Sequence, residues 1–258
     1  MTPRALLLDL EGTVFQSGAL IPGAGEALAE ASRRGVAWRF VTNATSRPRS
    51  VILRELSEMG LDAHVEIGPD RLFTAPRAAR RMLLDRGWKR CHFLVRPALL
   101  EDFDGIASVD SGADAVVLGD LGSGMSYERL NQAFRLLLDG AGLVTLARNR
   151  YWQGEDGLML DAGPFCAALE HATGKHAVLA GKPSRAFFEA ALSSTGLPAS
   201  EAAVVGDDIE SDVGGGQEAG MRGILVRTGK FRDGDPERSS VRPDAVIDSI
   251  ARLPELLR

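Results

Sequence analysis

The chain has 258 residues, 45% of them apolar, so it can bury a full core in one large domain or two smaller ones. A formal net charge of −5 gives no electrostatic reason to expect nucleic acid or anionic lipid as a partner, and no run of 18 apolar residues predicts a membrane span. The spacing of Cys91 and Cys166 argues against a zinc site or a disulfide framework, and Asp9 and Glu11 interrupt the N-terminal leucines of any signal peptide, so a cytoplasmic protein is expected.

The first part of the chain alternates short apolar runs with segments of helical period, which predicts an α/β fold with a parallel sheet. Residues 5–10 are continuously apolar up to Asp9, as is typical of a strand buried on both faces. The expected elements are, in order, a strand at 5–10, a helix at 24–34, a strand at 36–41, a turn at 42–47 and a helix at 48–59.

The middle of the chain has its own alternating set of elements, which predicts an inserted α/β domain at 75–177 within a domain made of 1–74 and 178–258. The expected elements of the insert are helices at 75–86, 127–139 and 164–173 and strands at 91–95, 115–119 and 143–147. After it we expect strands at 202–208, 223–226 and 244–247 and helices at 184–195, 210–219 and 249–257.

Polar residues stand where four of the apolar segments end, and the carboxyl ends of parallel strands form the crevice in which ligands bind. These ends are Asp9-Leu10-Glu11-Gly12-Thr13, Thr42-Asn43, Gly181-Lys182-Pro183 and Gly206-Asp207-Asp208, the last followed by Glu210 and Asp212. Clustered carboxylates repel one another unless a cation lies among them, and hard oxygen ligands suit Mg²⁺. A phosphate bound to Mg²⁺ would explain a hydroxyl and a lysine nearby.

Each segment also has an ordinary explanation when it is taken alone. GDDIESD at 206–212 can cap a helix, TNAT at 42–45 can be a turn, and Lys182 can be a solvated surface charge. The combination of the segments, and not any one of them, favours a phosphate and metal site.

The segments DLEGT, VTNAT, GKP and GDDIESD, in this order, resemble the four motifs of the haloacid dehalogenase (HAD) superfamily of phosphotransfer enzymes. The long insert between the second and third motifs, with VGGGQEAGMRGILVRTGK after the fourth, resembles the NagD-like branch. The resemblance implies a Rossmann-like core with a parallel sheet, a large inserted α/β cap domain, Mg²⁺ as the cofactor and a homodimer formed through the cap. The implied activity is hydrolysis of a small phosphorylated substrate.

The resemblance also implies a role for each matching residue. Asp9 would be the nucleophile that forms an aspartyl-phosphate, and Lys182 would neutralise charge and keep Asp9 ionised. The side chains of Asp9 and Asp207 and the backbone carbonyl of Glu11 would hold the metal. Two further pairs follow from the motifs: Thr42 and Asn43 for binding the phosphoryl group, and Asp208 and Asp212 for holding the metal's waters or orienting the lysine.

Glu11 stands where most phosphatases of the family have an aspartate that protonates the leaving oxygen and then activates water. Its reference pKa lies only about 0.4 units above that of Asp, so the chemistry is available to it. The added methylene displaces the carboxyl by roughly 1.5 Å, and a misplacement of that order can cost about 10²-fold in rate. A slow or narrow phosphatase is therefore predicted.

The segment at 147–157 corresponds to a cap loop that faces the active site in NagD-like relatives. Many relatives have the pattern Asn-Pro-Asp in this loop, whereas this sequence has Arg148, Asn149 and Arg150. The two arginines could meet anionic substrate groups. The alternative interpretation is a solvated loop with a half-buried aromatic residue.

Two other functions compete with the phosphatase. A protein that binds phosphorylated ligands with little turnover would fit the altered acid, although it would not need the nucleophile Asp9. Residues 214–219, GGGQEA, fit the dinucleotide fingerprint, but they begin eight residues after Gly206, where the apolar strand ends, instead of opening the helix directly behind it. A dinucleotide-dependent enzyme is thus the more remote alternative.

Overall fold

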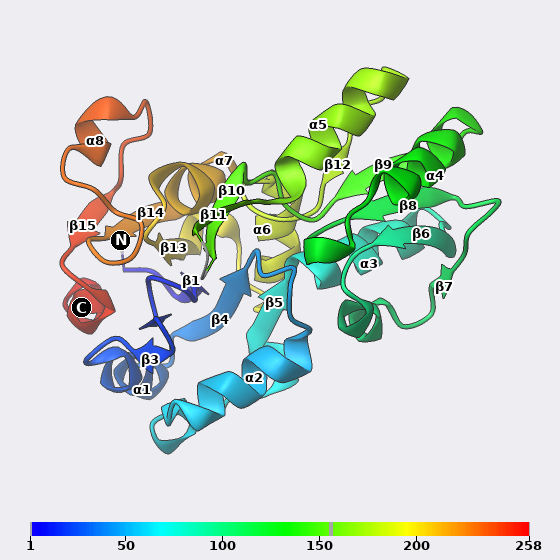
Figure 1. The fold of residues 1–258 in the computed structure, drawn as a ribbon. Helices are drawn as coiled ribbons and strands as arrows, with labels where there is room; N and C mark the ends of the chain where they lie inside the picture. Colours follow the sequence, from blue (N-terminus) through cyan, green and yellow to red (C-terminus); the bar gives the residue numbers. More distant parts are fainter. Residues whose placement is uncertain (1, 155–156, 258) are drawn as a thin grey trace. The chain divides into compact units, whose positions relative to one another are not determined.

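The computed structural model describes residues 2–154 and 157–257 and has an α/β fold with two parallel sheets (Figure 1). Contacts divide the chain into two compact units. The first comprises Met1–Thr42, Arg49–Phe73 and Lys182–Arg258, and the second comprises Asn43–Pro48 and Thr74–Gly181. Among the described residues, no helix has the length and apolar character needed to cross a membrane.

A six-stranded sheet forms the centre of the first unit. In spatial order its strands are β15 (Ala245–Ile247), β14 (Arg222–Val226), β13 (Ala202–Gly206), β1 (Ala5–Asp9), β4 (Ala37–Thr42) and β5 (Leu72–Thr74). All five residues of β1 are buried, and the strand pairs in parallel with β13 on one side and β4 on the other. The continuous apolar run at the N-terminus thus forms the central strand that the sequence predicts.

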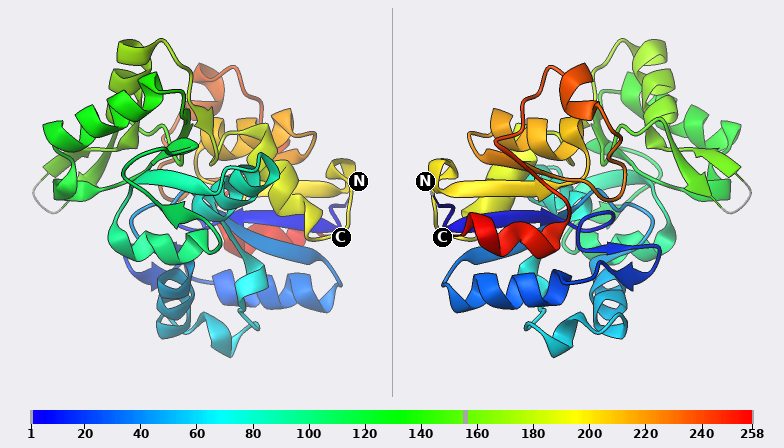
Figure 2. Two further views of the ribbon diagram at one scale, coloured as in Figure 1. Left: turned by 90° about the vertical axis from the view of Figure 1, so that its right-hand side faces the viewer. Right: turned by 90° about the vertical axis from the view of Figure 1, so that its left-hand side faces the viewer.

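Helical segments cover both faces of this sheet, as two further views show (Figure 2). The helix α1 (Ala24–Arg33) packs with the 3₁₀ segment η7 (Ile250–Leu256), and the helix α6 (Arg185–Ser193) packs with α7 (Gly215–Glu218) on the opposite face. The chain leaves β1 toward β4 and later returns to β13 on the other side of β1. The direction of strand order therefore reverses at β1, and such a switch point places a crevice at the carboxyl ends of β1 and β13.

The second unit has its own parallel sheet of five strands. In spatial order they are β12 (Val178–Leu179), β9 (Gly142–Thr145), β8 (Ala115–Leu118), β6 (Arg90–Leu94) and β7 (Ala107–Ser108). One apolar cluster joins the sheet to α3 (Ala75–Asp85) and the 3₁₀ segment η3 (Pro97–Phe103), and a second joins it to α4 (Tyr127–Leu138) and α5 (Ala162–Thr173).

Several elements differ from the expected ones. The predicted helix at 210–219 is a π-helical segment, η6 (Ile209–Gly214), followed by the short α7. The predicted C-terminal helix is the 3₁₀ segment η7, which has Pro254 inside it, where a backbone N–H donor is missing. Segments expected as loops contain the ribbon β10 (Tyr151–Gly154) and β11 (Gly157–Leu160), the hairpin β2 (Phe15–Gln16) and β3 (Ala19–Leu20), and the helix α8 (Asp235–Arg238).

The remaining elements are short or lie at the edge of the first unit. They are the helix α2 (Arg49–Glu58) and the 3₁₀ segments η1 (Leu61–Ala63), η2 (Pro69–Arg71), η4 (Gly122–Gly124) and η5 (Ala199–Glu201). The helix α2 occupies the predicted position at 48–59, and α1 ends before Gly35, which has a positive φ of 70°. Both helices therefore follow the periodicity and end signals of the sequence.

Candidate active site

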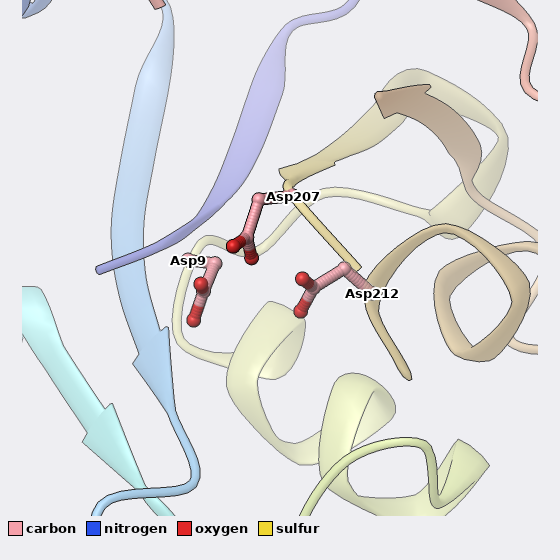
Figure 3. A group of neighbouring side chains, drawn as sticks. All are labelled: Asp9, Asp207 and Asp212. Carbon is pink, nitrogen blue, oxygen red and sulfur yellow. The ribbon is translucent and has the colours of Figure 1, made fainter. Parts of the chain in front are cut away.

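Three buried carboxylates of the first unit face one another at the switch point (Figure 3). Asp9 is the last residue of β1, Asp207 directly follows β13, and Asp212 lies in η6. The parallel pairing of β1 with β13 sets Leu8 opposite Val205, so Asp9 and Asp207 emerge at neighbouring strand ends. One oxygen from each of the three carboxylates lies within 4.8 Å of the others. The fold thus brings together Asp9, from the DLEGT segment, and Asp207, from the GDDIESD segment.

Lys182 supplies a buried cation to this group. Its Nζ lies 2.5 Å from Oδ1 of Asp9 and 2.6 Å from Oδ1 of Asp212, and its side chain is only 6% exposed. Burial alone would lower the pKa of Lys182, but the carboxylates of Asp212 and Asp9 outweigh burial and raise the pKa above its ordinary value. The ammonium group is therefore charged throughout the physiological range.

Burial has the opposite effect on the acids. It raises the pKa of Asp207 to about 6, with a further contribution from the charge of Asp212. It also raises the pKa of Asp212 to about 6, despite the lowering effect of Lys182. The pKa of Asp9 is raised by burial as well, an effect that Lys182 opposes and Asp207 reinforces. The protein alone thus leaves an excess of negative charge that a cation would relieve.

The surroundings of Asp207 fit a bound metal ion. Its Oδ2 accepts a hydrogen bond of 2.6 Å from the backbone N–H of Lys230, whereas its Oδ1 is buried without a hydrogen-bond partner among the described residues. Buried polar atoms are normally paired, so an unpaired carboxylate oxygen beside two further carboxylates is the arrangement that a hard divalent cation satisfies. The carboxylate oxygens of Asp9, Asp207 and Asp212 lie close enough together to hold such a cation.

Two glycines make room for the Asp207 carboxylate. Gly12 has a φ of 86° and Gly229 a φ of 61°, a region that disfavours other residues. A Cβ atom on either glycine would collide with Oδ2 of Asp207. The loops after β1 and β14 are thereby able to close over this carboxylate, and the Thr228 hydroxyl donates a hydrogen bond to the Gly12 carbonyl.

The side chain of Glu11 lies outside the group of three carboxylates. Glu11 is exposed, and its Oε1 accepts a hydrogen bond of 3.2 Å from the backbone N–H of Ser17, in the turn between β2 and β3. Ser17 has a φ of 52°, which is uncommon for a residue other than glycine. The glutamate side chain, longer than that of an aspartate, thus reaches Ser17 at the tip of the hairpin formed by β2 and β3.

The other predicted core residues lie as follows. Thr42 is buried at the end of β4, next to β1, where Asp9 is in register with Val41. Asp208 accepts hydrogen bonds from the backbone N–H groups of Glu210 and Ser211, and it forms a 3.2 Å ion pair with Lys230. Burial would raise the pKa of Asp208, but the hydrogen bond from Ser211 and the charge of Lys230 lower it below the ordinary value.

The remaining predicted residues belong to the second unit. Asn43 lies so close to Gly181 that a Cβ atom on the glycine would collide with the Asn43 side-chain oxygen. Arg148, Asn149 and Arg150 are exposed between β9 and β10. The guanidinium of Arg148 forms a 2.5 Å ion pair with Glu170, so this charge already has a partner within the unit.

The glycines of the GGGQEA segment have a packing role. A Cβ atom on Gly215 would collide with Phe188 and Pro183, and one on Gly216 would collide with Val204. Both glycines are buried in α7, so their lack of side chains lets this helix approach the sheet closely. This contact explains them without a dinucleotide.

Lys230 is the site residue that the sequence analysis did not find. Its backbone N–H donates to Asp207 and its Nζ donates to Asp208, although Lys230 lies more than twenty positions after both acids. Thr228, Gly229 and Lys230 directly follow Val226 and Arg227 at the end of β14. The sequence does contain a signal for this segment, because β14 is a further parallel strand and its carboxyl end reaches the same edge of the sheet as those of β1 and β13.

Comparisons with known proteins show the family to which the chain belongs. A family model described as haloacid dehalogenase-like hydrolase matches residues 6–107, and one described as HAD-hydrolase-like matches residues 179–253. The chain is 44% identical to haloacid dehalogenase-like hydrolase domain-containing protein 2 of Homo sapiens over 95% of this chain and 92% of that protein. It is 39% identical to phospholysine phosphohistidine inorganic pyrophosphate phosphatase of Rattus norvegicus over 98% of this chain and 94% of that protein.

Solved structures show the same fold. A 4-nitrophenylphosphatase from Thermotoga maritima superposes with a TM-score of 0.91 at 30% identity, covering 99% of this chain and 98% of that one. NagD from E. coli K-12 has a TM-score of 0.88 over 97% of this chain and 98% of that one, and its 23% identity makes this a likeness of fold alone.

The chain therefore belongs to the haloacid dehalogenase-like hydrolase family. Within that family it is a hydrolase with the fold of NagD, and two of its relatives, at 39% and 30% identity, are named phosphatases. The predicted family and the predicted α/β fold are both confirmed.

Proposed function

We propose that the protein is a Mg²⁺-dependent phosphatase that hydrolyses a small phosphate monoester, or a related phosphoryl compound, through an aspartyl-phosphate on Asp9. The observation that carries the proposal is the convergence of Asp9, Lys182 and Asp207, with Oδ1 of Asp207 buried and unpaired. A bound Mg²⁺ would offset the charge of the carboxylates and of the phosphate. We assign the catalytic core to 1–74 and 178–258 and the cap to 75–177.

The reaction would proceed in two displacements. A carboxylate oxygen of Asp9 attacks phosphorus, the bond from phosphorus to the ester oxygen breaks, and the leaving oxygen takes a proton from Glu11. Water then gives its proton back to Glu11 and attacks the same phosphorus, which releases inorganic phosphate and free Asp9. Lys182 keeps Asp9 ionised and in place through the 2.5 Å contact, and Thr42 and Asn43 would bind the phosphoryl oxygens.

Slow turnover follows from the position of Glu11, whose carboxylate is bound at Ser17. Changing Glu11→Asp should raise kcat for an alkyl phosphate monoester by about tenfold or more, because misplaced acids cost up to about 10²-fold. The rise should be smaller for 4-nitrophenyl phosphate, whose leaving group needs little protonation. The matched control is Glu210→Asp, which shortens an exposed glutamate of the same unit. An unchanged or lower rate with the alkyl ester would show that Glu11 is not a misplaced acid.

Metal binding should depend on pH through Asp207 and Asp212. In the folded protein their pKa values are about 6, above the ordinary 3.8, so the fold favours the protonated form of both acids. Without metal, this contribution to the free energy of unfolding is fully present below about pH 4 and is lost as the pH rises through 6. A shift of two units corresponds to about 3 kcal/mol per group. Mg²⁺ needs the ionised carboxylates, so it should raise Tm by several degrees at pH 8 and little at pH 5.

The test is Tm with Mg²⁺ and with a chelator across this pH range. Asp207→Asn is the control, and it should abolish the increase in Tm at pH 8 while the chain remains folded. An equal Mg²⁺ effect at both pH values, or none at either, would contradict the assignment of the metal to these carboxylates.

We propose that the cap mediates a homodimer and selects the substrate, with Arg148, Asn149 and Arg150 as the residues to test for contacts with anionic groups. Of the nine exposed large apolar side chains among the described residues, eight lie in the second unit. Five of these, on β10 and β11, are Tyr151, Trp152, Leu158, Met159 and Leu160. Such surfaces on soluble chains mark association sites.

Light scattering should therefore give a molar mass of twice 27.5 kDa. Leu158→Glu should shift the protein to the monomer, because a charge would have to be buried at the interface. Val246→Glu, at the exposed apolar residue of the first unit, is the control and should leave the dimer intact. A monomeric wild-type chain at micromolar concentration would contradict the dimer.

A phospho-ligand-binding protein with little turnover is the second candidate, and the Glu11 to Ser17 contact is what favours it. Binding of a phosphate ester in the presence of Mg²⁺, without any release of phosphate, would support it. We keep a cytoplasmic location as part of the proposal, because Cys91 and Cys166 are free thiols.

A further inference from the structure

The second unit contains a pocket of about 420 Å³ at the open edge of its sheet. The short strand β7 pairs with β6 only at Arg90, opposite Ala107, and at Cys91, opposite Ser108. Among the described residues, no strand lies beside the rest of β6 on that edge. The pocket lies there, lined by His92 and Phe93 of β6 and by Ser108 of β7. Its volume is within the range of small-molecule sites.

The peptide groups of β6 provide polar atoms at this edge. In a parallel sheet, successive residues direct their N–H and C=O groups to alternate sides of the strand. The Cys91 carbonyl accepts a hydrogen bond of 2.9 Å from the N–H of Val109 on the β7 side. Phe93, two residues further, directs its peptide groups to the same side, where β7 has ended.

His92 presents an unpaired buried nitrogen among the residues that line the pocket. The histidine is 4% exposed, and its Nδ1 lies 3.0 Å from the Val109 carbonyl, which can only accept, so Nδ1 carries a proton. In the neutral ring Nε2 is then an acceptor, and it is buried without a hydrogen-bond partner among the described residues. A buried acceptor without a partner is unfavourable, and a ligand with an N–H or O–H donor could supply the missing hydrogen bond.

Two opposite charges line the same pocket without pairing. Asp110 lies in the loop between β7 and β8. Gln132 of α4 donates hydrogen bonds of 3.2 Å to its carbonyl and to its Oδ1, which connects this loop to α4. Arg129 lies three residues before Gln132 and so on the same face of α4. Its guanidinium forms no ion pair with Asp110 or with any other described residue. A molecule with a positive and a negative group could bridge the two.

The rest of the lining is apolar and comes from Val95, Pro97 and Leu100. Leu100 is 36% exposed, although large aliphatic side chains usually avoid water. The pocket thus combines a cation, an anion, a buried acceptor and an apolar wall.

We propose that this pocket binds a free α-amino acid with a branched apolar side chain. Its carboxylate pairs with Arg129, its ammonium group donates to Asp110 and to Nε2 of His92, and its side chain contacts Val95 and Leu100. None of the residues assigned to phosphate hydrolysis takes part, so the site does not depend on the proposed catalytic function.

The test is calorimetric titration of the full chain with L-leucine, which should bind with a Kd of about 1 mM or tighter. Three probes each lack one feature: 4-methylpentanoate has no ammonium group, 3-methylbutylamine has no carboxylate, and glycine has no apolar side chain. Each should bind at least about fivefold more weakly, the effect of about 1 kcal/mol for one exposed contact. N-acetyl-leucinamide, which has neither charge, should bind more weakly still.

Variants test the location. Arg129→Gln and Asp110→Asn change exposed side chains and should each weaken L-leucine binding at least fivefold with unchanged Tm. Arg135→Gln, the same change elsewhere on α4, should leave binding intact. The proposal is overturned if L-leucine does not bind at 10 mM, if N-acetyl-leucinamide binds as tightly, or if Arg129→Gln has no more effect than Arg135→Gln.

Discussion

Asp9→Asn is expected to lower kcat/KM for phosphate esters by more than about 10⁴-fold, because removing the nucleophile of an enzyme typically costs this much activity. The amide has the shape of the carboxylate and keeps an acceptor for Lys182, but it cannot form the bond to phosphorus. The measurement is phosphate release with Mg²⁺ from a panel of esters.

Asp208→Asn is the matched control for this change. Asp208 contacts Lys230 and the start of η6 but lies outside the group of three facing carboxylates, so this variant should keep activity within about 10²-fold of the wild type. Rapid quenching followed by mass spectrometry should find a phosphoryl adduct on the wild-type peptide that contains Asp9. Equal losses in the two variants, or an adduct on another residue, would contradict the nucleophile assignment.

Lys182→Met should reduce both stability and activity. Removing the ammonium leaves the carboxylates of Asp9 and Asp212 buried without their cation, and breaking a buried pair costs about 3–5 kcal/mol. The rate should fall by about 10²- to 10³-fold, as when one preorganised donor to the transition state is lost. Denaturant unfolding and phosphate release measure the two effects.

The control is Lys230→Met, the same change at a lysine whose side chain is 67% exposed. Its ion pair with Asp208 should contribute no more than about 1 kcal/mol. The stability lost by Lys182→Met should be partly recovered as the pH falls. Without the lowering effect of Lys182, the pKa of Asp212 lies higher than in the wild type, so the acid becomes neutral at a higher pH. If this variant does not fold, Lys182→Arg, which keeps the charge but moves its position, should fold and still lose rate. Full activity of Lys182→Arg would contradict a positioned ammonium group.

The central strand and the convergence of the motifs could be predicted because both depend on local signals. The run before Asp9 is apolar at every position, and parallel strands bring their carboxyl ends to one edge, so the sequence predicts one site for Asp9, Asp207 and Lys182. Orienting Lys182 is one of the two roles that the resemblance implies for Asp212, and the structure shows this pair. The sequence pattern alone does not reveal it, because Asp212 lies in η6, a π-helical segment.

The features that were missed depend on contacts distant in sequence or on very short elements. The strands β2 and β3 have two residues each, too few for a periodic pattern, yet their hairpin contains the Ser17 N–H that binds Glu11. The ribbon of β10 and β11 shows no alternation, because Leu158, Met159 and Leu160 are apolar in succession. Pro254 argues against an α-helix at 249–257, because it has no backbone N–H to donate. The carbonyls of Pro254, in η7, and of Leu257, directly after η7, accept hydrogen bonds from Arg34.

The most direct test of the account is a crystal structure with Mg²⁺ and fluoroberyllate, an inert mimic of the phosphoryl group. The account predicts beryllium bonded to a carboxylate oxygen of Asp9, Mg²⁺ bound by Asp9 and Asp207, and Lys182 in contact with the mimic. Fluoroberyllate attached to any other residue, or Mg²⁺ bound away from Asp207, would contradict it.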